Sequence, residues 1–295
     1  MTKIGFVGLG RMGGSMATRL MDAGYAVYGT ARNRASVESL IDQGLDWRDT
    51  ARQVAETTEV LITSLPDDNA LLAVSSGPNG ALAGLGPGKI WIDTSTVSPL
   101  VAKGLASRVH RHGVAMLAAP VSGSVPQVQS GTLAIMVGGS REAFERVEPT
   151  LRQLGTPRYV GDNDQALILK LAINVSLGVQ AIAFAEGLLL ALGSGIDAEL
   201  ALDVLTGSAI GSPMLKARGP LMLDSAGEAW FDIDFMKKDM ELALEAAAEL
   251  PVPLPSASRA DELLAMATKR GYGSRDIAAL FDVLRGLALD DGMAA

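Results

Sequence analysis

Three glycines near the start of the chain have the spacing of a phosphate-binding turn. An apolar run from Ile4 to Val7 leads into Gly8-x-Gly10-x-x-Gly13, and a helical pattern follows. Gly8 permits a tight turn from strand to helix, Gly10 lets the backbone approach a pyrophosphate, and Gly13 lets the helix pack closely on the strand. The free N–H groups of the helix N-terminus then attract the phosphates. We therefore predict a dinucleotide site whose first contacts are Gly8, Leu9, Gly10, Arg11, Met12 and Gly13.

The residues after the second predicted strand bear on the choice between NAD and NADP. This strand covers residues 25–30, and Arg32, Asn33 and Arg34 follow it without a carboxylate. An acidic side chain at this place binds the ribose 2′-hydroxyl of NAD, whereas arginine accommodates the 2′-phosphate of NADP. A solvated basic loop is the plain alternative. Together with the glycine motif, the two arginines favour NADP(H), with Arg32 as the main phosphate contact.

Hydride transfer also needs a group that exchanges a proton with the substrate oxygen. The two histidines, His110 and His112, lie at the polar end of a predicted helix, where a cation complements the helix dipole. None of the four tyrosines is followed by lysine four positions later. Lys170, by contrast, lies in a strongly apolar helix with Asn174 one turn further on the same face. A lysine there could extend to solvent, but the pairing favours an acid–base role for Lys170.

Alternating segments predict the scaffold that must position these residues. Apolar runs bounded by Gly, Pro or Ser predict strands, and helical patterns lie between them, which indicates βαβ units and a doubly wound parallel sheet. The fold class is therefore α/β, with an N-terminal Rossmann domain over residues 1–162. The predicted strands are residues 4–7, 25–30, 60–65, 90–93, 115–118 and 134–137, and the helices between them include 35–43, 99–110 and 141–154.

Beyond residue 162 the pattern is entirely helical. A long helix over residues 166–192 is expected to join the Rossmann domain to an all-α domain covering 163–295. Asp197 and Ser256 are candidate N-caps for two of the later helices. The remaining helices are predicted at residues 198–206, 237–249, 257–270 and 277–287.

Composition excludes several functional classes. The chain has 295 residues, of which 48% are hydrophobic, so a large buried core is expected. A net charge of −8 argues against nucleic-acid binding, which needs clustered lysine and arginine. The absence of cysteine excludes disulfides, thiolate nucleophiles and Cys-ligated metals. We predict no metal site.

The same sequence argues for a cytoplasmic protein that does not enter a membrane. A strand begins directly after Lys3, which leaves no room for a signal peptide. The most apolar segment, residues 166–192, carries Lys170, Asn174, Gln180 and Glu186, which a bilayer would not accept cheaply. We therefore interpret this segment as a buried helix.

Four motifs follow one another along the chain: Gly8–Gly13, residues 119–124 with 131–133, Lys170-x-x-x-Asn174 and Lys238-Asp239. Together they resemble the β-hydroxyacid dehydrogenase family, which includes 3-hydroxyisobutyrate dehydrogenase, tartronate semialdehyde reductase and the glyoxylate/succinic semialdehyde reductases. The likeness runs nearly end to end. Two departures from the family pattern are the segment 161–165 before the lysine and Ile173, where several members carry a second asparagine.

The resemblance implies roles for individual residues. Lys170 would be the general acid in reduction, and Asn174 would orient the substrate. Ser122 and the backbone at Gly123 would hold the substrate carboxylate. Lys238, among the cofactor contacts, and Phe231, among the substrate contacts, would complete the site. The other implied cofactor contacts are Leu65 and Pro66, and the segment 93–96 with Thr96 at its end, which would meet the nicotinamide ribose.

The expected activity is NADPH-dependent reduction of a small aldehyde that carries a carboxylate. The segment 212–222 is similar to the glyoxylate/succinic semialdehyde reductase branch, so succinic semialdehyde and glyoxylate lead. A 3-hydroxyisobutyrate or tartronate semialdehyde enzyme is the alternative. An imine reductase is a more remote one, since its members typically lack the lysine. A cofactor-dependent reader domain, as in some chromatin proteins, is the non-enzymatic alternative and would carry basic extensions.

An oligomer is also expected. The helix over residues 166–192 is apolar around most of its circumference, which is more surface than one domain is expected to cover. Dimers are usual in the family that the chain resembles. We therefore predict a homodimer or homotetramer.

Overall fold

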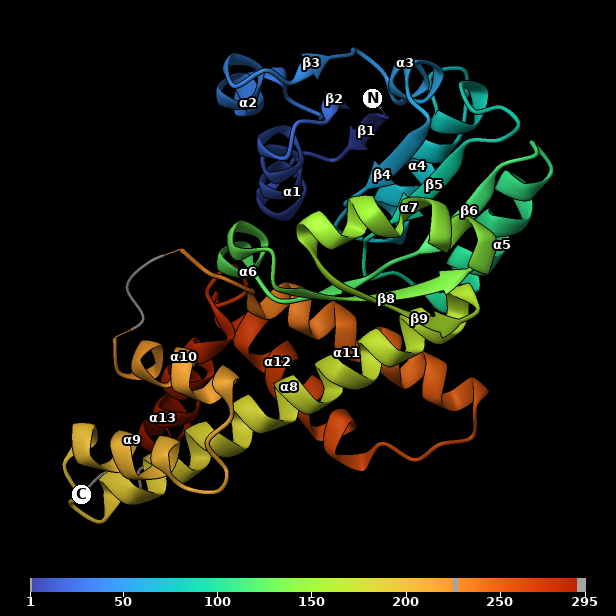
Figure 1. Cartoon of the computed structure of the whole chain (residues 1–295). Coiled ribbons are helices and arrows are strands. Elements are labelled where there is room, and N and C mark those ends of the chain that lie inside the picture. Colours follow the sequence, from blue (N-terminus) through green and yellow to red (C-terminus); the bar gives the residue numbers. More distant parts are fainter. Residues whose placement is uncertain (1, 225–227, 291–295) are drawn as a thin grey trace. The chain divides into compact units, whose positions relative to one another are not determined.

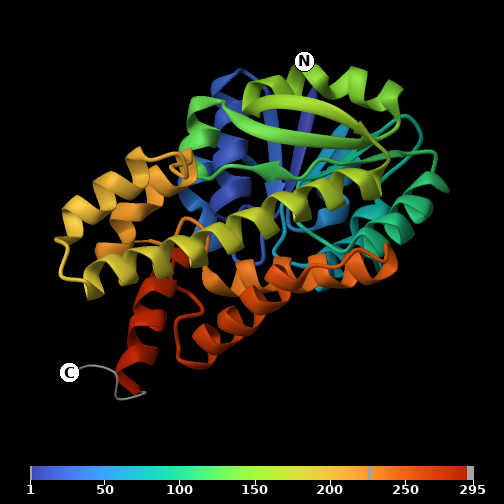
Figure 2. The same ribbon diagram turned by 90° about the horizontal axis from the view of Figure 1, so that it is seen from below.

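The computed structural model describes residues 2–224 and 228–290 (Figure 1). The chain divides into two compact units, one up to Lys170 and one from Leu171 onward. The boundary between them falls inside helix α8 (Asn163–Gly193), which Figure 2 shows as one continuous helix. Each unit is described by itself below.

The first unit is built on a mixed sheet. In the described residues the strands follow the order β3-β2-β1-β4-β5-β6-β8-β7, with β9 paired to β8. The six strands β1 to β6 are parallel to one another. Strand β8 runs antiparallel to β6 and β7, and β9 is parallel to β8. The strands are β1 (Lys3–Val7), β2 (Ala26–Thr30), β3 (Asp46–Trp47), β4 (Val60–Thr63), β5 (Ile90–Asp93), β6 (Ala115–Ala118), β7 (Val121–Ser122), β8 (Leu133–Gly139) and β9 (Gly155–Gly161).

The strand order contains a reversal that locates a binding edge. From β1 the chain winds first to β2 and β3, and then returns to β4 on the other side of β1. In open parallel sheets, ligands bind at such a switch point, beyond the carboxyl ends of the strands. The central strands are buried on both faces, which is why β4 and β5 are continuous apolar runs in the sequence. The predicted Rossmann fold is thereby confirmed.

Helices of the first unit pack on this sheet. Helix α1 contacts α6 and α7, and α3 contacts β1 and β2. Met16 and Leu20 of α1 join Phe144 and Val147 of α7 in the main core, over Phe6 and other sheet residues. The helical elements are α1 (Arg11–Asp22), η1 (Arg34–Val37), α2 (Glu38–Asp42), α3 (Ala51–Thr57), α4 (Asp68–Ser75), η2 (Ala81–Ala83), α5 (Pro99–His110), α6 (Val125–Ser130) and α7 (Arg141–Leu154).

The described part of the second unit contains helices and no named strand. By length and composition alone α8 could cross a membrane, but core helices of soluble proteins pass the same test and one such helix is weak evidence. Its residues Ile182 and Phe184 lie in two separate hydrophobic cores of the unit. The elements are the remainder of α8, α9 (Ala198–Gly207), α10 (Pro213–Leu223), α11 (Ile233–Glu249), α12 (Pro255–Lys269), η3 (Ile277–Ala279) and α13 (Leu280–Asp290).

Of the two N-caps predicted for the second unit, one is confirmed and one is wrong. Asp197 caps α9 by accepting a hydrogen bond from the Leu200 backbone N–H at 3.0 Å, as predicted. The prediction for Ser256 is wrong, because α12 begins at Pro255 and its N-cap is Leu254. Proline is favoured at the first helical position, since its missing N–H has no helical partner to lose, and that preference places the helix start one residue earlier than Ser256.

Candidate active site

The glycine turn between β1 and α1 has the shape that a dinucleotide requires. Gly8 has φ +95°, and a Cβ there would overlap the Ser64 carbonyl oxygen. A Cβ at Gly13 would overlap the carbonyl oxygen of Gly8. At Gly10, in contrast, a Cβ would meet nothing within 4 Å. The backbone is therefore tightly packed at the two outer glycines and open at the middle one, which is where a pyrophosphate would approach.

The N-terminus of α1 offers donors to such a pyrophosphate. Gly10 is the N-cap, no side chain caps the helix, and its first turn contains no acidic residue. The N–H groups of this turn and the positive end of the helix dipole are therefore directed at an anion. Among the predicted contacts, Arg11 is exposed, Met12 is partly buried, and Leu9 is buried in the core.

In the loop after β2, the three residues predicted to select the cofactor have different surroundings. Asn33 uses its side chain to cap η1, accepting from the Ala35 N–H at 3.0 Å. The guanidinium of Arg34 lies 5.8 Å from the centre of the Trp47 ring. Arg32 is exposed and forms no hydrogen bond or ion pair with the residues described. These side chains present positive charge beside β2, with Thr30 and not a carboxylate at the end of the strand.

A buried polar network fixes the loops after β4 and β5. Asp93 is 1% exposed and accepts hydrogen bonds from the hydroxyls of Thr63 at 2.7 Å and Ser95 at 2.6 Å. The Ser95 hydroxyl oxygen in turn accepts the Leu65 N–H at 2.9 Å. The segment Leu65–Pro66 is thereby held at the binding edge. In the segment 93–96 the first three side chains are buried and Thr96 is partly exposed, and the contact of this segment with a nicotinamide ribose stays a prediction.

The predicted substrate loop begins where β6 ends. Its Ser122 pairs with Ala134 in β7 and β8, and among the described residues its hydroxyl has no hydrogen-bond partner. Gly123 follows with φ +132° and is exposed. The loop then closes in a capping box, in which Gln127 Oε1 accepts from the backbone N–H and the hydroxyl of Ser124, both at 2.9 Å. A hydroxyl and an exposed backbone N–H are the donors that bind a carboxylate.

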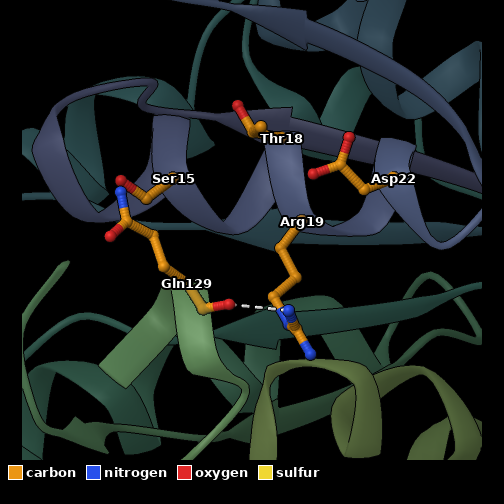
Figure 3. A pocket seen from close by; sticks show the side chains of 5 residues that line it. All are labelled: Ser15, Thr18, Arg19, Asp22 and Gln129. Carbon is orange, nitrogen blue, oxygen red and sulfur yellow. Dashed lines mark hydrogen bonds between the residues drawn. The ribbon is translucent and has the colours of Figure 1, made fainter. Parts of the chain in front are cut away.

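Arg19 links the dinucleotide helix to this loop (Figure 3). Its Nη1 donates to the Gln129 carbonyl oxygen at 2.7 Å and its Nε donates to that of Gln153 at 2.6 Å. Gly131 ends α6 with φ +67°, and a Cβ there would overlap the Arg19 guanidinium. A pocket of about 280 Å³ beside this link is lined by Ser15, Thr18, Arg19, Asp22 and Gln129, none of them a predicted site residue.

Lys170 lies two turns along a helix whose start is fixed in the first unit. Asn163 Oδ1 accepts the Ala118 N–H at 2.7 Å, and its Nδ2 donates to the Met116 carbonyl oxygen at 3.3 Å. These contacts attach the start of α8 to β6, the strand that leads into the Ser122 loop. Lys170 itself is 9% exposed.

Asn174 is oriented by a residue that the sequence reasoning did not place in the site. It is 1% exposed, and its Nδ2 donates to Asp239 Oδ2. Asp239 is 2% exposed, with Lys238 Nζ 2.9 Å from Oδ1. Lys238 and Asp239 therefore form an ion pair whose carboxylate is buried. The missed signal was position, since Asp239 lies on the same buried face of α11 as Met236 and Met240.

Phe231 is placed by a carboxylate that joins three segments of the second unit. Asp276 Oδ2 accepts the backbone N–H groups of Trp230 and Phe231 at 2.9 and 3.1 Å. Oδ1 accepts that of Ala278 at 3.0 Å. Arg218, which is 7% exposed, lies 3.7 Å from Oδ2 and 5.6 Å from the Trp230 ring. Burial lowers the pKa of Arg218, and the charge of Asp276 opposes that shift.

Within residues 2–224 and 228–290, no group of three His, Asp or Glu side chains lies close enough together to hold a metal ion. The groups that could do chemistry are therefore the glycine turn, the basic loop after β2, the Ser122 loop, Lys170, and the Asn174–Asp239–Lys238 and Phe231 clusters. The first four belong to the first unit and the last two to the second.

Comparison with known proteins matches both parts of the chain to NAD-binding domains of dehydrogenases. Residues 3–164 match the NAD binding domain of 6-phosphogluconate dehydrogenase, and residues 165–284 match the NAD-binding domain of NADP-dependent 3-hydroxyisobutyrate dehydrogenase. The chain is 31% identical to glyoxylate/succinic semialdehyde reductase 2 of Arabidopsis thaliana, over 96% of this chain and 79% of the relative. It is 34% identical to 2-hydroxy-3-oxopropionate reductase of Escherichia coli, over 97% and 98%.

Solved structures show the same architecture. A 3-hydroxyisobutyrate dehydrogenase from Salmonella typhimurium superposes with a TM-score of 0.88 at 28% identity, over 96% of this chain and all of that one. An imine reductase from Pseudomonas superposes with a TM-score of 0.64 at 23% identity, over 96% and 99%, which shows a shared fold only.

The fold and the matched domains define an NAD(P)-dependent oxidoreductase that acts on hydroxyl and aldehyde groups. The chain belongs to the β-hydroxyacid dehydrogenase family, as its motifs indicated. Its activity is that of a hydroxyacid dehydrogenase or reductase.

The Asp276 cluster yields a stability prediction. Asp276→Ala would leave three backbone N–H groups and the buried Arg218 cation without their acceptor. We expect the free energy of unfolding to fall by about 3 kcal/mol, measured by urea denaturation. Asp276→Asn keeps an acceptor oxygen and should lose about half as much. The control is Arg285→Ala, which removes one side of an exposed ion pair and should cost less than about 1 kcal/mol. Equal losses for all three variants would contradict the role given to Asp276.

Proposed function

We propose that the protein is an NADPH-dependent reductase of small aldehydes that carry a carboxylate. The observation that carries this proposal lies within the first unit. The start of α8 is bonded through Asn163 to β6, the strand that leads into the Ser122 loop. That arrangement ties the helix of a buried lysine to a loop with free carboxylate-binding donors, on a domain built to bind a dinucleotide.

Each residue would then have a defined task in the reduction. The bound nicotinamide supplies the hydride that is added to the carbonyl carbon. Lys170 delivers the proton that the carbonyl oxygen takes up as the alcohol forms. The Ser122 hydroxyl and the Gly123 N–H hold the substrate carboxylate. Asn174, oriented by Asp239, hydrogen-bonds the substrate and limits its orientations.

The preference for NADPH over NADH is supported by charge. The end of β2 offers no carboxylate for a ribose 2′-hydroxyl, and Arg32 and Arg34 follow it. A guanidinium binds a phosphate through several charge-assisted hydrogen bonds. We therefore assign the 2′-phosphate to Arg32, with Arg34 and Asn33 beside it.

The leading substrates are succinic semialdehyde and glyoxylate. Similarity to the Arabidopsis reductase, which is named for both, supports this choice. The relative from Escherichia coli, named for 2-hydroxy-3-oxopropionate, supports the alternative that the chain serves tartronate semialdehyde or 3-hydroxyisobutyrate. An imine reductase is disfavoured by Lys170, because its members typically lack this lysine, and by the Ser122 loop, because a simple cyclic imine has no carboxylate for that loop to bind.

Removal of the proton donor tests the proposed reaction. In Lys170→Ala we expect kcat for NADPH-linked reduction of succinic semialdehyde or glyoxylate to fall about 10²- to 10⁴-fold. The assay is the loss of NADPH absorbance. Lys103→Ala removes an exposed lysine of α5 and should leave the rate unchanged. If Lys170→Ala were as active as the unmodified protein, another group would have to be the acid.

Removal of the proposed phosphate contact tests the choice of cofactor. Arg32→Ser should raise the KM for NADPH about 10- to 100-fold, because a charge-assisted hydrogen bond is lost. The KM for NADH should change less than about threefold. The measurement is the ratio of kcat/KM for NADPH to kcat/KM for NADH, in the variant and in the unmodified protein. A variant with an unaltered ratio would show that Arg32 does not read the 2′-phosphate.

We also propose that the protein forms a homodimer or a homotetramer. Several large apolar side chains of the second unit are exposed, among them Leu190 at 79%, Leu200 at 56% and Val204 at 59%. Light scattering should give a particle of two or four times the 30.6 kDa chain mass. Leu200→Lys with Val204→Lys should lower that mass, whereas Leu100→Lys, at a more exposed position on α5, should not. A 30.6 kDa particle for the unmodified protein would refute this proposal.

A further inference from the structure

A short strand brings a tryptophan beside the basic loop after β2. Strand β3 pairs with β2 in parallel, with Asp46 opposite Tyr28 and Trp47 opposite Gly29. Trp47 is half-buried and packs against the main core. The guanidinium of Arg34, an exposed residue, lies 5.8 Å from the centre of its ring, a distance at which a cation and an aromatic face attract each other.

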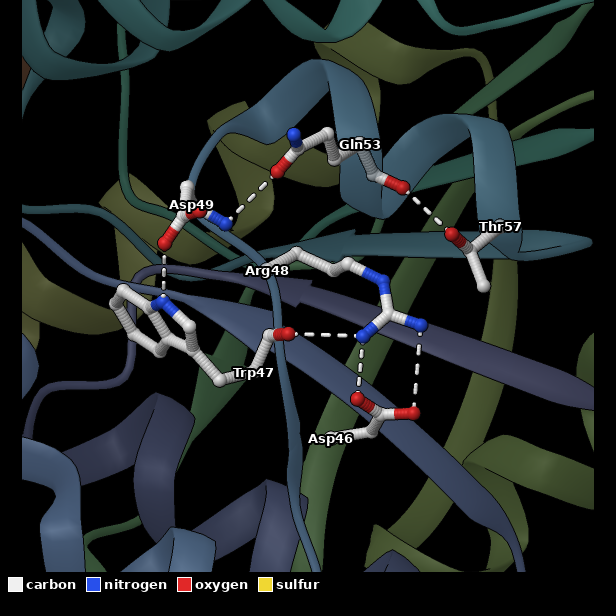
Figure 4. Close-up of polar contacts among 6 residues, drawn as sticks. All are labelled: Asp46, Trp47, Arg48, Asp49, Gln53 and Thr57. Carbon is white, nitrogen blue, oxygen red and sulfur yellow. Dashed lines mark hydrogen bonds and ion pairs between the residues drawn. The ribbon is translucent and has the colours of Figure 1, made fainter.

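The indole ring is held in place from the next helix (Figure 4). Trp47 Nε1 donates to Asp49 Oδ1 at 2.8 Å, and the Asp49 backbone N–H donates to Gln53 Oε1 at 2.9 Å. Gln53 belongs to α3, and its carbonyl oxygen accepts the Thr57 hydroxyl at 2.7 Å. The orientation of the ring is thereby fixed by α3 through two hydrogen bonds, before any ligand is bound.

Arg48, a second arginine near an aromatic ring, differs from Arg34 in the use of its hydrogen-bond donors. Arg48 lies over the Tyr28 ring at 4.9 Å, but its donors are also used, by the Asp46 carboxylate and by the Trp47 carbonyl oxygen at 2.8 Å (Figure 4). For Arg34 the structure gives the contact with the ring and no hydrogen bond or ion pair to the described residues. A guanidinium has five N–H donors, and the contact with the ring uses none of them in a hydrogen bond.

We propose that Trp47 is a specificity-determining residue for the cofactor, which positions Arg34 so that its donor edge meets the ribose 2′-phosphate. The ring limits the rotamers of a long, exposed side chain, and less entropy is then lost when the phosphate binds. Arg34 therefore acts as a preorganised second phosphate contact beside Arg32. This inference rests on the proposed preference for NADPH.

The experiment uses two fragments that differ by the 2′-phosphate. Binding of 2′,5′-ADP and of 5′-AMP to the full chain is measured by isothermal titration calorimetry. Trp47→Leu should raise the Kd of 2′,5′-ADP about threefold to tenfold and that of 5′-AMP less than about twofold. Trp47→Phe keeps an aromatic face and should recover part of the affinity. Asp49→Ala frees the ring and should give an intermediate loss.

The controls separate positioning from charge and from folding. Arg48→Ala removes an arginine of the same segment whose donors are already used, and it should leave both Kd values within about twofold. Arg34→Ala should weaken 2′,5′-ADP at least as much as Trp47→Leu. Thermal unfolding of each variant identifies any variant that does not fold. If Trp47→Leu does not fold, the inference is tested with Trp47→Phe and Asp49→Ala.

Three outcomes would overturn the inference. Unchanged binding of 2′,5′-ADP by Trp47→Leu would remove Trp47 from phosphate recognition, and if Arg32→Ser still lost NADPH selectivity, the proposed function would stand. Equal weakening of both fragments would make Trp47 a contact to the adenosine. If the unmodified protein bound 2′,5′-ADP no more tightly than 5′-AMP, the preference for NADPH and the role of Trp47 would both fail.

Discussion

The binding edge depends on a steric constraint between the two outer glycines of the first turn. A side chain at Gly13 would overlap the Gly8 carbonyl oxygen, and one at Gly8 would overlap the carbonyl oxygen of Ser64. With both positions bare, α1 packs directly on β1 and its N-terminus points beyond the end of the sheet. The open backbone at Gly10 and the uncapped N–H groups of α1 then become an anion site.

Hydrogen bonds of polar side chains fix the loops around that edge. Asp93 and Ser95 hold the loop after β4, Asn163 attaches α8 to β6, and Arg19 joins α1 to the end of the substrate loop. Asp93 and Ser95 are buried, so their polar atoms need hydrogen bonds within the protein, whereas Asn163 and Arg19 are partly exposed. Loops fixed in this way hold Ser122 and the start of the Lys170 helix to the same strand, and catalysis by positioning needs this rigidity.

Sequence periodicity predicted the regular elements well, because the central strands and amphipathic helices bury apolar side chains at fixed intervals. Helices α5 and α7 begin and end at the predicted residues. The short elements were missed. Strands β3 and β7 are two residues long, too short for any period. Helices α6 and α10 have proline in the first turn, and β9 contains Pro157 and two glycines, all of which resemble loop signals in a sequence.

Site residues could be predicted from the sequence where the residue type and its local spacing fit few roles. Glycines at 8, 10 and 13, and a lysine in an apolar helix, each narrow the chemistry sharply. Roles that depend on distant partners were not predictable. Asp239 reaches Asn174 across 65 positions, and Trp47 meets Arg34 only because a two-residue strand adds to the sheet. No local spacing encodes such pairs, since tertiary packing alone brings them together.

The most direct test of the account is a comparison of two aldehydes that differ only by the carboxylate. Initial rates of NADPH oxidation are measured with succinic semialdehyde and with butanal. If the Ser122 loop holds a carboxylate while Lys170 protonates the carbonyl oxygen, kcat/KM for butanal should be lower by about 100-fold or more. Equal values for the two aldehydes would contradict the account, because the donors of the Ser122 loop would then have no part in recognising the substrate.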